Sequence, residues 1–344
     1  MTMADVTIMG AGVFGLTVAL ACADRGARVR VFEKRHPGAG SSGGIVGALA
    51  PHVPENWNPK KAMQLDALRM AESYWADVAA RGGVDPGYAR TGRVQPLAEA
   101  AVALARTREH QARELWQGFA QWCVLPVADA PGLAVDAPSG FVVHDTLTAR
   151  LHPRRAGAAL VAALAAQGVT VEQGDRPEGG TVIWATGYEG LAELSQALGR
   201  KMGGGVKGQS LLLDHAAPDM PQVFADGLHI VPHADGTIAI GSTSEREFDA
   251  PDTTDALCGA LHASAIAACP QLANAPVIAR WAGVRPRAQS RAPLMGAWPD
   301  RAGHFVFNGG FKIGFAMAPA LAQIMADLVL EGRDHVPEGF ALTA

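Results

Sequence analysis

The stretch Gly10-Ala11-Gly12-Val13-Phe14-Gly15 decides the fold of this chain. It follows the short apolar run from Asp5 to Met9, which is typical of a buried parallel strand, and it precedes apolar residues at helical spacing from Leu16 to Arg25. A second apolar run, 27–32, ends at Glu33. Strand, Gly-x-Gly-x-x-Gly, helix, strand and acid in this order predict a Rossmann-type dinucleotide-binding unit.

Four residues of this unit have expected roles. Gly10 permits a tight turn, Gly12 lets the backbone approach a phosphate, and Gly15 lets the helix and strand pack closely. Glu33 lies 18 residues after Gly15, close to the spacing of about 20 at which a carboxylate reaches a ribose hydroxyl. We therefore expect a dinucleotide cofactor at this loop.

The segment after Glu33 favours FAD over a nicotinamide cofactor. A nicotinamide enzyme usually continues into another plain helix, whereas this chain enters the glycine- and serine-rich segment 37–44, which contains Ser41 and Ser42. Backbone and hydroxyl donors in such a segment suit a pyrophosphate. The alternative is a flexible surface loop, but the position directly after the ribose-binding acid favours phosphate binding.

A second glycine-rich loop, Asn308 to Gly314, lies near the other end of the chain. It follows a predicted strand at 303–307 and precedes a predicted helix at 316–330. Because a helix N-terminus favours negative charge, one loop would bind the pyrophosphate and the other would face a ring that gains charge on reduction. The pair of loops predicts a flavin enzyme.

Composition limits the remaining possibilities. The 344 residues are enough for two domains, and 49% hydrophobic with 18% charged residues suit a folded enzyme. A formal net charge of −4 argues against a dedicated nucleic-acid binder. With no leader-like segment and no run of 18 apolar residues, we expect a cytoplasmic protein without a membrane span. The four cysteines form no Cys-x-x-Cys pair and the 11 histidines show no metal-ligand spacing, so no metal site is expected.

The remaining pattern predicts a second domain. Helices are expected at 60–81, 98–123, 154–167 and 255–269, and strands at 140–143, 169–171, 181–187, 211–213, 228–231 and 237–240, with a strand pair around Gly92 within 88–97. We expect an α/β fold in which a discontinuous Rossmann-type FAD-binding domain (1–55, 145–205 and 284–344) carries an inserted α+β substrate-binding domain with a mixed sheet (56–144 and 206–283).

Several short motifs occur in an order that resembles a known family. They are Gly10 to Gly15, Glu33, Ser41-Ser42, Gly47-Ala48-Leu49-Ala50-Pro51-His52, Leu151-His152-Pro153, Ala185-Thr186-Gly187, Val206-Lys207-Gly208, Trp281-Ala282-Gly283-Val284-Arg285-Pro286, and the segment from Gly310 to Pro319. In the order and spacing of these motifs the chain resembles, over nearly its whole length, the D-amino acid oxidase family of flavoproteins, and within it the glycine oxidase branch.

The resemblance implies non-covalently bound FAD and the oxidation of glycine, a D-amino acid or a sarcosine-like secondary amine. Hydride would pass from the substrate Cα to flavin N5, giving an imine and then an oxo acid. Dioxygen would reoxidise the flavin and yield hydrogen peroxide. No cysteine follows Cys269, so a thioether-linked flavin has no obvious ligand in that region.

The resemblance also assigns site residues. The carboxylate-binding arginine of the family falls on Arg285, and a guanidinium fork suits that task because it grips a carboxylate bidentately. The remaining candidate positions bind the cofactor: Gly10, Gly12, Val13, Phe14, Gly15, Glu33, Lys34, Ser41, Ser42, Val46, Gly47, Ala48, Gly187, Phe311, Lys312, Ile313, Gly314 and Phe315.

The chain departs from the glycine oxidase pattern at three places. His229 stands where a tyrosine lies beside the substrate carboxylate; we expect it to titrate near neutral pH, and the alternative is a solvent-facing strand histidine. Lys312 replaces an arginine beside the flavin and would favour negative charge there, unless it is a plain surface lysine. The segment 172–180 is shorter than the β-meander of the family, which would weaken FAD retention. His52 is a further candidate for the substrate cavity.

Three other functions remain open from the sequence. A dehydrogenase of the same fold would pass electrons to a quinone or carrier protein. An oxidase of a modified tRNA nucleoside would need a basic face, for which the arginines at 280, 285, 287 and 291 are candidates. The third possibility is a non-enzymatic interaction module in which FAD has only a structural role. The expected partners are a small amine and dioxygen, and the sequence leaves open the substrate side chain, its stereochemistry and a homo-oligomer.

Overall fold

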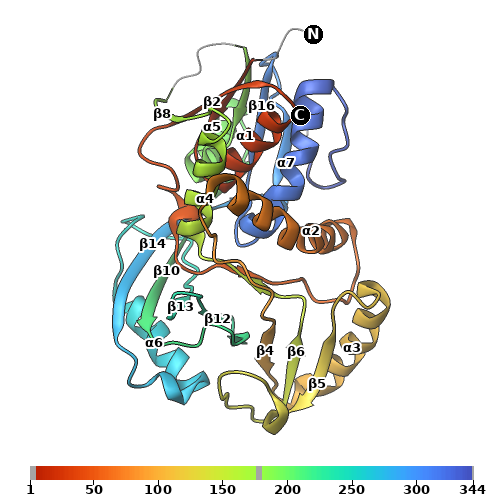
Figure 1. The fold of residues 1–344 in the computed structure, drawn as a ribbon, viewed down its shortest axis with the longest axis vertical. Helices are drawn as coiled ribbons and strands as arrows, with labels where there is room; N and C mark the ends of the chain where they lie inside the picture. The colour runs from red at the N-terminus through yellow and green to blue at the C-terminus, as the bar shows by residue number, and fades with distance from the viewer. Residues whose placement is uncertain (1–4, 176–179, 343–344) are drawn as a thin grey trace.

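The computed structural model describes residues 5–175 and 180–342. Two large sheets organise it, one in the upper part and one in the lower part of Figure 1. A two-stranded sheet of β3 (Ala48–Leu49) and β7 (Ala149–Arg150) completes the strand pairing, and short 3-10 helices lie at 41–43, 99–101, 127–129 and 270–272.

The first sheet has six strands in the order β15-β16-β9-β1-β2-β8. The bounds are β1 Asp5–Met9, β2 Arg28–Glu33, β8 Val171–Gln173, β9 Thr181–Trp184, β15 Leu294–Ala297 and β16 His304–Asn308. The paired strands are parallel except β15, which is antiparallel to β16. The central β1 buries Val6 and Ile8, and its carboxyl end carries the first glycine-rich loop, where sheets of this type bind ligands. The predicted Rossmann-type arrangement is confirmed.

Five helices accompany this sheet: α1 Val13–Asp24, α2 Pro59–Gly82, α4 Pro153–Ala165, α5 Gly187–Ala197 and α7 Gly314–Glu331. Helices α1, α2, α4 and α7 contact one another around one core, which includes the fully buried Trp75 and Phe307. Among the described residues, α7 alone is long and apolar enough to cross a membrane, and half of it is buried inside the protein. Its packing against α1 and α2 makes it a core helix.

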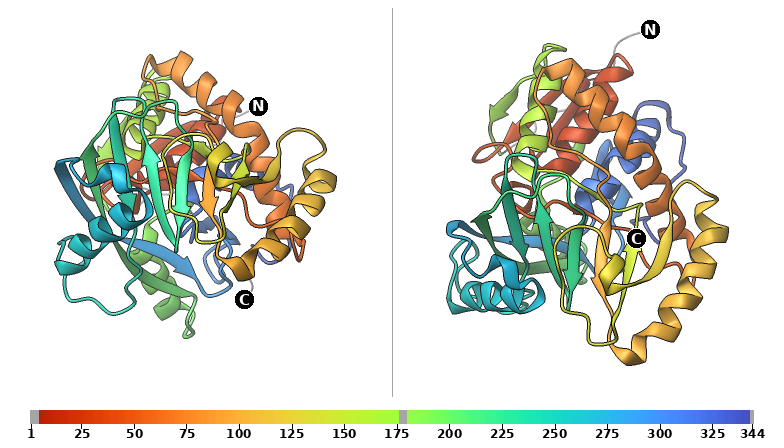
Figure 2. Two further views of the ribbon diagram at one scale, coloured as in Figure 1. Left: turned by 90° about the horizontal axis from the view of Figure 1, so that it is seen from below. Right: turned by 60° about the horizontal axis from the view of Figure 1, so that its bottom comes forward.

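The second sheet is mixed and has eight strands in the order β14-β10-β13-β12-β11-β4-β6-β5. The bounds are β4 Arg93–Pro96, β5 Trp122–Pro126, β6 Phe141–Asp145, β10 Gly203–Asp214, β11 Gln222–Ala225, β12 Leu228–Pro232, β13 Thr237–Gly241 and β14 Val277–Ala288. Only β11 and β4 pair in parallel among these described neighbours. Helices α6 (Ala256–Ala268) and α3 (Val102–Trp116) lie toward opposite ends of the sheet (Figure 2).

Two predicted domain boundaries fall inside strands. The boundary at 205/206 lies within β10 and that at 283/284 lies within β14, and these two strands pair along most of their length. The chain therefore crosses from one expected domain to the other within the paired strands β10 and β14. The expected domain limits remain a prediction. The prediction of a shortened segment at 172–180 falls partly on residues 176–179, which lie outside the described residues.

Several predicted elements were wrong in extent: the strand expected at 181–187 ends at Trp184, and the strand expected at 211–213 spans Gly203–Asp214. The helix expected at 98–123 ends at Trp116, because Gln117 and Gly118 both adopt positive φ, and Trp122 and Cys123 instead begin β5. Trp122 packs edge-on against Trp116 with ring centroids 6.1 Å apart, which returns the chain onto α3. The strand pair expected around Gly92 is a single strand, β4; before it, Ala89 forms only an isolated bridge with Arg150.

Candidate functional site

The first glycine-rich loop makes a tight turn between β1 and α1. Gly10 has φ of +101°, and a Cβ there would lie 2.6 Å from the Ala185 carbonyl oxygen, so only glycine fits. A Cβ on Gly15 would lie 1.8 Å from the Gly10 carbonyl oxygen, which agrees with its expected packing role. The loop therefore holds the start of α1 directly against the end of β9.

The N-terminus of α1 faces the serine-rich segment. Gly12 caps α1 without a side-chain hydrogen bond, and the Val13 N–H donates to Ser42 Oγ at 3.0 Å. Glu33 Oε2 accepts the Ala11 N–H at 2.9 Å, so the acid at the end of β2 holds the same loop. Backbone donors, a hydroxyl and a helix N-terminus thus meet at one place, which is the donor set that binds phosphates.

The nucleotide cavity extends from this loop along the carboxyl ends of β1, β2 and β9. Its lining includes eleven of the predicted cofactor residues: Gly10, Gly12, Val13, Phe14, Glu33, Lys34, Ser41, Ser42, Gly187, Phe311 and Gly314. A Cβ on Gly187 would meet no atom within 4 Å, so the wall is open there. A long cavity with glycine walls and the donors at the α1 N-terminus fits FAD.

A second cavity, which we call the substrate cavity, adjoins the nucleotide cavity. The two share Val13, Ser41, Ser42, Phe311 and Gly314 in their linings. Arg285, His229 and Lys312 line the substrate cavity, together with Val46, Gly47, Ala48 and Phe315. A flavin that spans the shared residues would place its ring beside Arg285, because the nucleotide end belongs at Gly10 and Glu33.

Three predicted residues lie elsewhere. Gly15 and Ile313 line neither cavity within the described part of the chain. Gly15 packs against the Gly10 carbonyl, and Ile313 occupies the N-cap position of α7. His52 is also absent from both linings, and its Nδ1 contacts the side-chain oxygen of Gln64 on α2. The prediction that His52 faces the substrate cavity is therefore not met, because α2 holds its ring.

Arg285 projects from β14 and is 9% exposed. Its guanidinium donates to the Ser242 hydroxyl, to the Thr243 carbonyl at 2.6 Å and to the Lys207 carbonyl at 3.2 Å. Its buried Nε has no hydrogen-bond partner in the described structure. Burial lowers the pKa of Arg285 to about 10, so the side chain remains a cation at neutral pH. A buried cation whose residue lines a cavity is suited to an anionic ligand.

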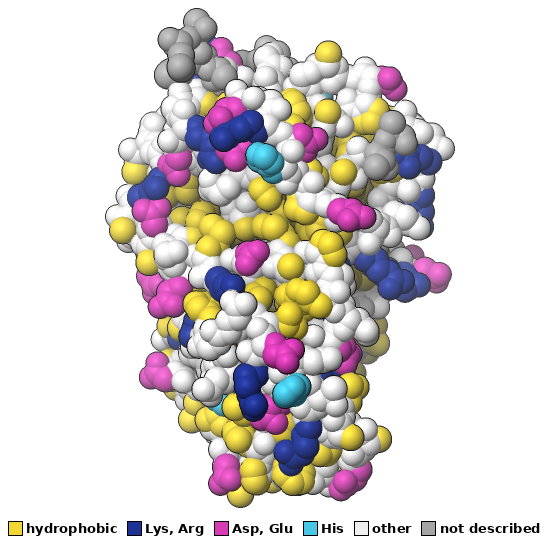
Figure 3. All heavy atoms as spheres, turned by 90° about the vertical axis from the view of Figure 1, so that its right-hand side faces the viewer, with side chains coloured by type: hydrophobic (Ala, Val, Ile, Leu, Met, Phe, Trp, Pro, Cys, Tyr) yellow, Lys and Arg dark blue, Asp and Glu magenta, His cyan; other side chains and the backbone are white. Residues whose placement is uncertain are grey.

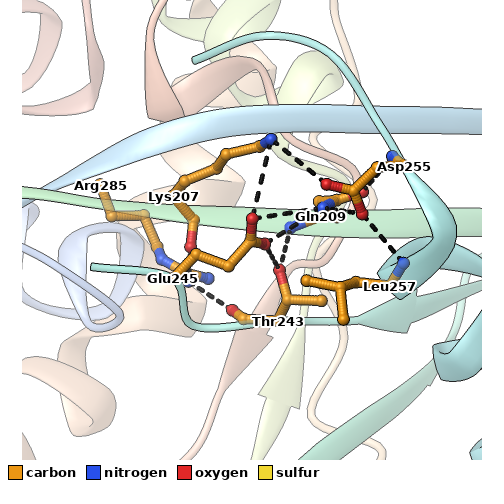
Figure 4. A network of polar contacts seen from close by, with 7 residues as sticks. All are labelled: Lys207, Gln209, Thr243, Glu245, Asp255, Leu257 and Arg285. Atoms are coloured by element: carbon orange, nitrogen blue, oxygen red, sulfur yellow. Dashed lines mark hydrogen bonds and ion pairs between the residues drawn. The ribbon is translucent and has the colours of Figure 1, made fainter. Parts of the chain in front are cut away.

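A polar network behind Arg285 fixes its position (Figure 4). The buried Lys207 Nζ lies 3.7 Å from Glu245 and 3.9 Å from Asp255. Gln209 Nε2 donates to Asp255 at 2.8 Å and also to Glu245. The backbone carbonyls that accept from Arg285 belong to residues anchored in this network, so the orientation of the guanidinium is built into the sheet.

His229 does not have the environment expected from the sequence. It lies on β12, half-buried, with its ring 4.6 Å from that of Phe224. Burial, and then the charges of Arg93 and Lys312, lower the pKa of His229 to about 3. This differs from the expectation that His229 titrates near neutral pH, because burial disfavours the charged ring.

Hydrogen bonds also fix the tautomer of His229. The Gln222 side-chain N–H donates to the Ala149 carbonyl at 3.1 Å, which leaves Gln222 Oε1 to accept from His229 Nδ1 at 3.3 Å. His229 Nε2 is then a hydrogen-bond acceptor. In the same cavity, desolvation and the charge of Arg285 lower the pKa of Lys312.

A family model described as FAD dependent oxidoreductase (DAO) matches residues 5–328. The chain belongs to this family. The FAD dependent oxidoreductase assignment covers both sheets and agrees with the flavin cofactor predicted from the two glycine-rich loops.

Individual members of the FAD dependent oxidoreductase family resemble the whole chain. A glycine oxidase of Pseudomonas putida is 28% identical over an alignment of 369 positions, which covers 97% of this chain and 98% of that protein. The crystal structure of glycine oxidase from Geobacillus kaustophilus aligns with a TM-score of 0.82 at 23% identity, over 98% of each chain. That of iminodiacetate oxidase from Chelativorans sp. aligns with a TM-score of 0.85 at 21% identity, over 98% of this chain and 100% of that chain.

Sequence reasoning missed several lining residues of this FAD dependent oxidoreductase. In the nucleotide cavity they include Trp184, Thr186, Tyr188 and Asn308, and in the substrate cavity Ser242 and Trp281. The small residues after β9 and the tryptophan before Arg285 were visible as motifs. Ser242 carried no signal, because its role depends on the pairing of β13 with β10, which brings it to Arg285.

Proposed function

We propose that this enzyme oxidises the C–N bond of a small amino acid or secondary amine whose carboxylate binds Arg285, with dioxygen as the electron acceptor. The observation that carries the proposal is the buried Arg285 cation, which lines a cavity that adjoins the nucleotide cavity. Glycine and iminodiacetate, after which two structural relatives are named, both combine an amine with a carboxylate. This combination supports the assignment.

FAD, when bound, supplies the acceptor for the hydride that leaves the substrate carbon. Arg285 provides orientation, because a carboxylate held at one end fixes which C–H bond faces the ring. At neutral pH an arginine remains charged, so the grip does not depend on pH. The substrate carboxylate would compete with the Ser242 hydroxyl for the guanidinium.

His229 suits the amine end of the substrate. Its Nε2 is an acceptor and its low pKa keeps the ring neutral, so it accepts a hydrogen bond from the amine but does not retain a proton. Lys312 adds a positive charge to the same cavity and would favour negative charge where the two cavities meet. A neutral amine, an oriented C–H bond and an electrostatically prepared site are the requirements of amine oxidation.

We also propose that FAD is bound non-covalently. None of the four cysteines, Cys22, Cys123, Cys258 and Cys269, lines either cavity in the described structure. Acid precipitation of the yellow protein should leave all of the flavin in the supernatant. Flavin that stays with the pellet would contradict this proposal.

The proposed function is tested by anaerobic mixing of the FAD-loaded protein with glycine, sarcosine, D-amino acids and L-proline, while flavin absorbance is followed. We expect one class of carboxylate-bearing amines to bleach the flavin, and the matched amine without a carboxylate (methylamine for glycine) not to do so. Admission of air then separates an oxidase from a dehydrogenase by recovery of the yellow colour with peroxide. Equal bleaching with and without the carboxylate would refute the role of Arg285.

A modified tRNA nucleoside fits the structure less well. The alternative requires a continuous basic face. On the one face drawn in Figure 3, which is the side away from β14, lysine and arginine alternate with aspartate and glutamate. Two of the candidate arginines also have other contacts. Arg285 lines the substrate cavity, and the Arg287 guanidinium lies 5.6 Å from the centroid of the Phe311 ring. The substrate-cavity arginine is therefore better explained by a small carboxylate.

A further inference from the structure

A cluster of two histidines and an aspartate lies outside both cavities. His152 immediately precedes α4, His233 follows β12, and Asp235 lies in the turn between β12 and β13. One ring nitrogen of each histidine and one carboxylate oxygen lie within 4.8 Å of one another. The sequence pattern does not indicate this cluster, because its two histidines lie 81 positions apart.

Hydrogen bonds prepare His233 as a ligand. The Thr237 hydroxyl donates to Asp235 Oδ1 at 2.7 Å, so its oxygen must accept from His233 Nδ1, 3.2 Å away. His233 is therefore protonated on Nδ1 and carries a lone pair on Nε2. This Nε2 is buried and has no partner in the described structure, and His233 is 1% exposed. Metal-binding histidines show the same arrangement, with the second nitrogen donating to a fixed acceptor.

His152 presents the complementary half of the cluster. Its Nδ1 is also buried without a partner among the described residues, and its side chain does not cap α4. The two imidazole rings lie 4.7 Å apart at an interplanar angle of 43°. No hydrogen bond joins the two rings among the described contacts, so two buried nitrogens are left without partners beside one carboxylate.

We propose that His152, His233 and Asp235 bind a divalent transition-metal ion, with Zn²⁺ as the expected ion. Two imidazole nitrogens and one carboxylate oxygen are ligands that Zn²⁺ accepts, whereas Mg²⁺ and Ca²⁺ prefer oxygen ligands alone. Ligands about 2.0–2.2 Å from a tetrahedral ion lie about 3.4 Å apart, so a pair at the 4.8 Å limit must close by about 1.4 Å. Asp235 is exposed in a turn, so its carboxylate can move toward the two nitrogens, and water would complete the coordination.

The surrounding charges set the expected affinity. Arg150, Arg154 and Arg155 approach the cluster, and Arg155 is paired with Asp85 at 3.0 Å. Arg150 donates to the carbonyls of Gly87 and Pro218. The remaining positive charge opposes a cation, so we expect binding weaker than that of a closed structural zinc site. The ion would join the β12–β13 hairpin, which carries His229, to the start of α4.

The test uses FAD-loaded protein that has been treated with a chelator and dialysed. Titration with Zn²⁺ by calorimetry should show one site per chain, and Co²⁺ should give visible absorption bands of a coordinated ion beside the flavin bands. We expect Zn²⁺ to raise the unfolding temperature of the wild type. Asp235→Asn keeps the size of an exposed side chain, and it should weaken Zn²⁺ binding at least tenfold.

Matched variants make the result decisive. His152→Gln should abolish the stabilisation by Zn²⁺, whereas His110→Gln, which changes an exposed histidine on α3, should leave it unchanged. If the Asp235 and His152 variants bind Zn²⁺ as tightly as the wild type, or if the wild type gains no stability from Zn²⁺, the proposal is wrong. Flavin content and amine turnover are measured in parallel, so a failure of the proposed oxidase function is seen separately.

Discussion

Gly208→Ala should displace the arginine on which the proposed activity depends. Gly208 lies on β10 beneath the Arg285 side chain, and a Cβ there would lie 2.5 Å from the guanidinium carbon and from both terminal nitrogens. Ordinary contact begins near 3.4 Å, so the guanidinium must move by about 1 Å. The β10 backbone itself needs no change, because Gly208 has no positive φ.

The expected loss follows from this displacement. A shift of about 1 Å in a positioning group lowers the rate about 100-fold, which equals about 2.7 kcal/mol of transition-state stabilisation. The hydrogen bonds to the carbonyls of Lys207 and Thr243 would stretch at the same time. FAD content should stay unchanged, because Gly208 lines neither cavity in the described structure.

The assay is kcat/KM for the best amine of the panel, measured beside flavin content and unfolding temperature. Gly204→Ala is the matched control, since Gly204 lies on the same strand and its added Cβ would meet no atom within 4 Å. The control should retain full activity. A Gly208→Ala enzyme with full FAD and kcat/KM within twofold of the wild type would show that the position of Arg285 does not govern the reaction.

Three further predictions concern the same site. Arg285→Ala should lower kcat/KM, mainly through a higher KM, by an amount equivalent to about 3–4 kcal/mol of transition-state stabilisation. Arg280→Ala, on the exposed side of β14, should leave kcat/KM unchanged. Equal losses in the two variants would contradict carboxylate binding by Arg285. His229 has a folded-state pKa of about 3, below its unfolded value of about 6.5, so its contribution to stability is present above pH 6.5 and is lost as pH falls toward 3. Urea midpoints at pH 7 and pH 4.5 should therefore differ less in His229→Gln than in the wild type, and an identical difference would contradict burial of the ring. Gly12→Ala places a Cβ 3.2 Å from Ser42 Oγ at the start of α1 and should weaken FAD binding at least tenfold in a fluorescence titration, while Gly157→Ala on α4 should not.

The sequence predicted the nucleotide-binding half well because its signals are local. The loop from Gly10 to Gly15, the acid Glu33 and the strands around them follow each other within about 30 residues, and their spacing alone determines the turn and the packing. The long helices α2 and α7 were also predicted within two residues of their observed ends, since their apolar faces repeat over several turns.

The failures depend on contacts between distant segments. The pKa of His229 is set by burial and by Arg93 and Lys312, which lie 136 and 83 residues away in the chain. His52 is held by Gln64 through the packing of α2, and nothing in the motif that contains it indicates that contact. The cluster of His152, His233 and Asp235 likewise needs the register of β12 and β13 before it exists.

The ribbon of β10 and β14 connects Arg285 directly to the second glycine-rich loop, 308–314. Arg285 is followed by Pro286, whose carbonyl accepts the Phe311 N–H at 2.9 Å, and Arg287 forms a bridge with Gly310. The distance between Arg285 and this loop is therefore set by three consecutive peptide units and not by the relative orientation of two independent bodies. Chimeras that exchange the substrate-binding half with a relative must consequently transfer both strands and the 308–314 loop as one block, and crossovers at 205 and 284 would cut the part that sets the reaction distance.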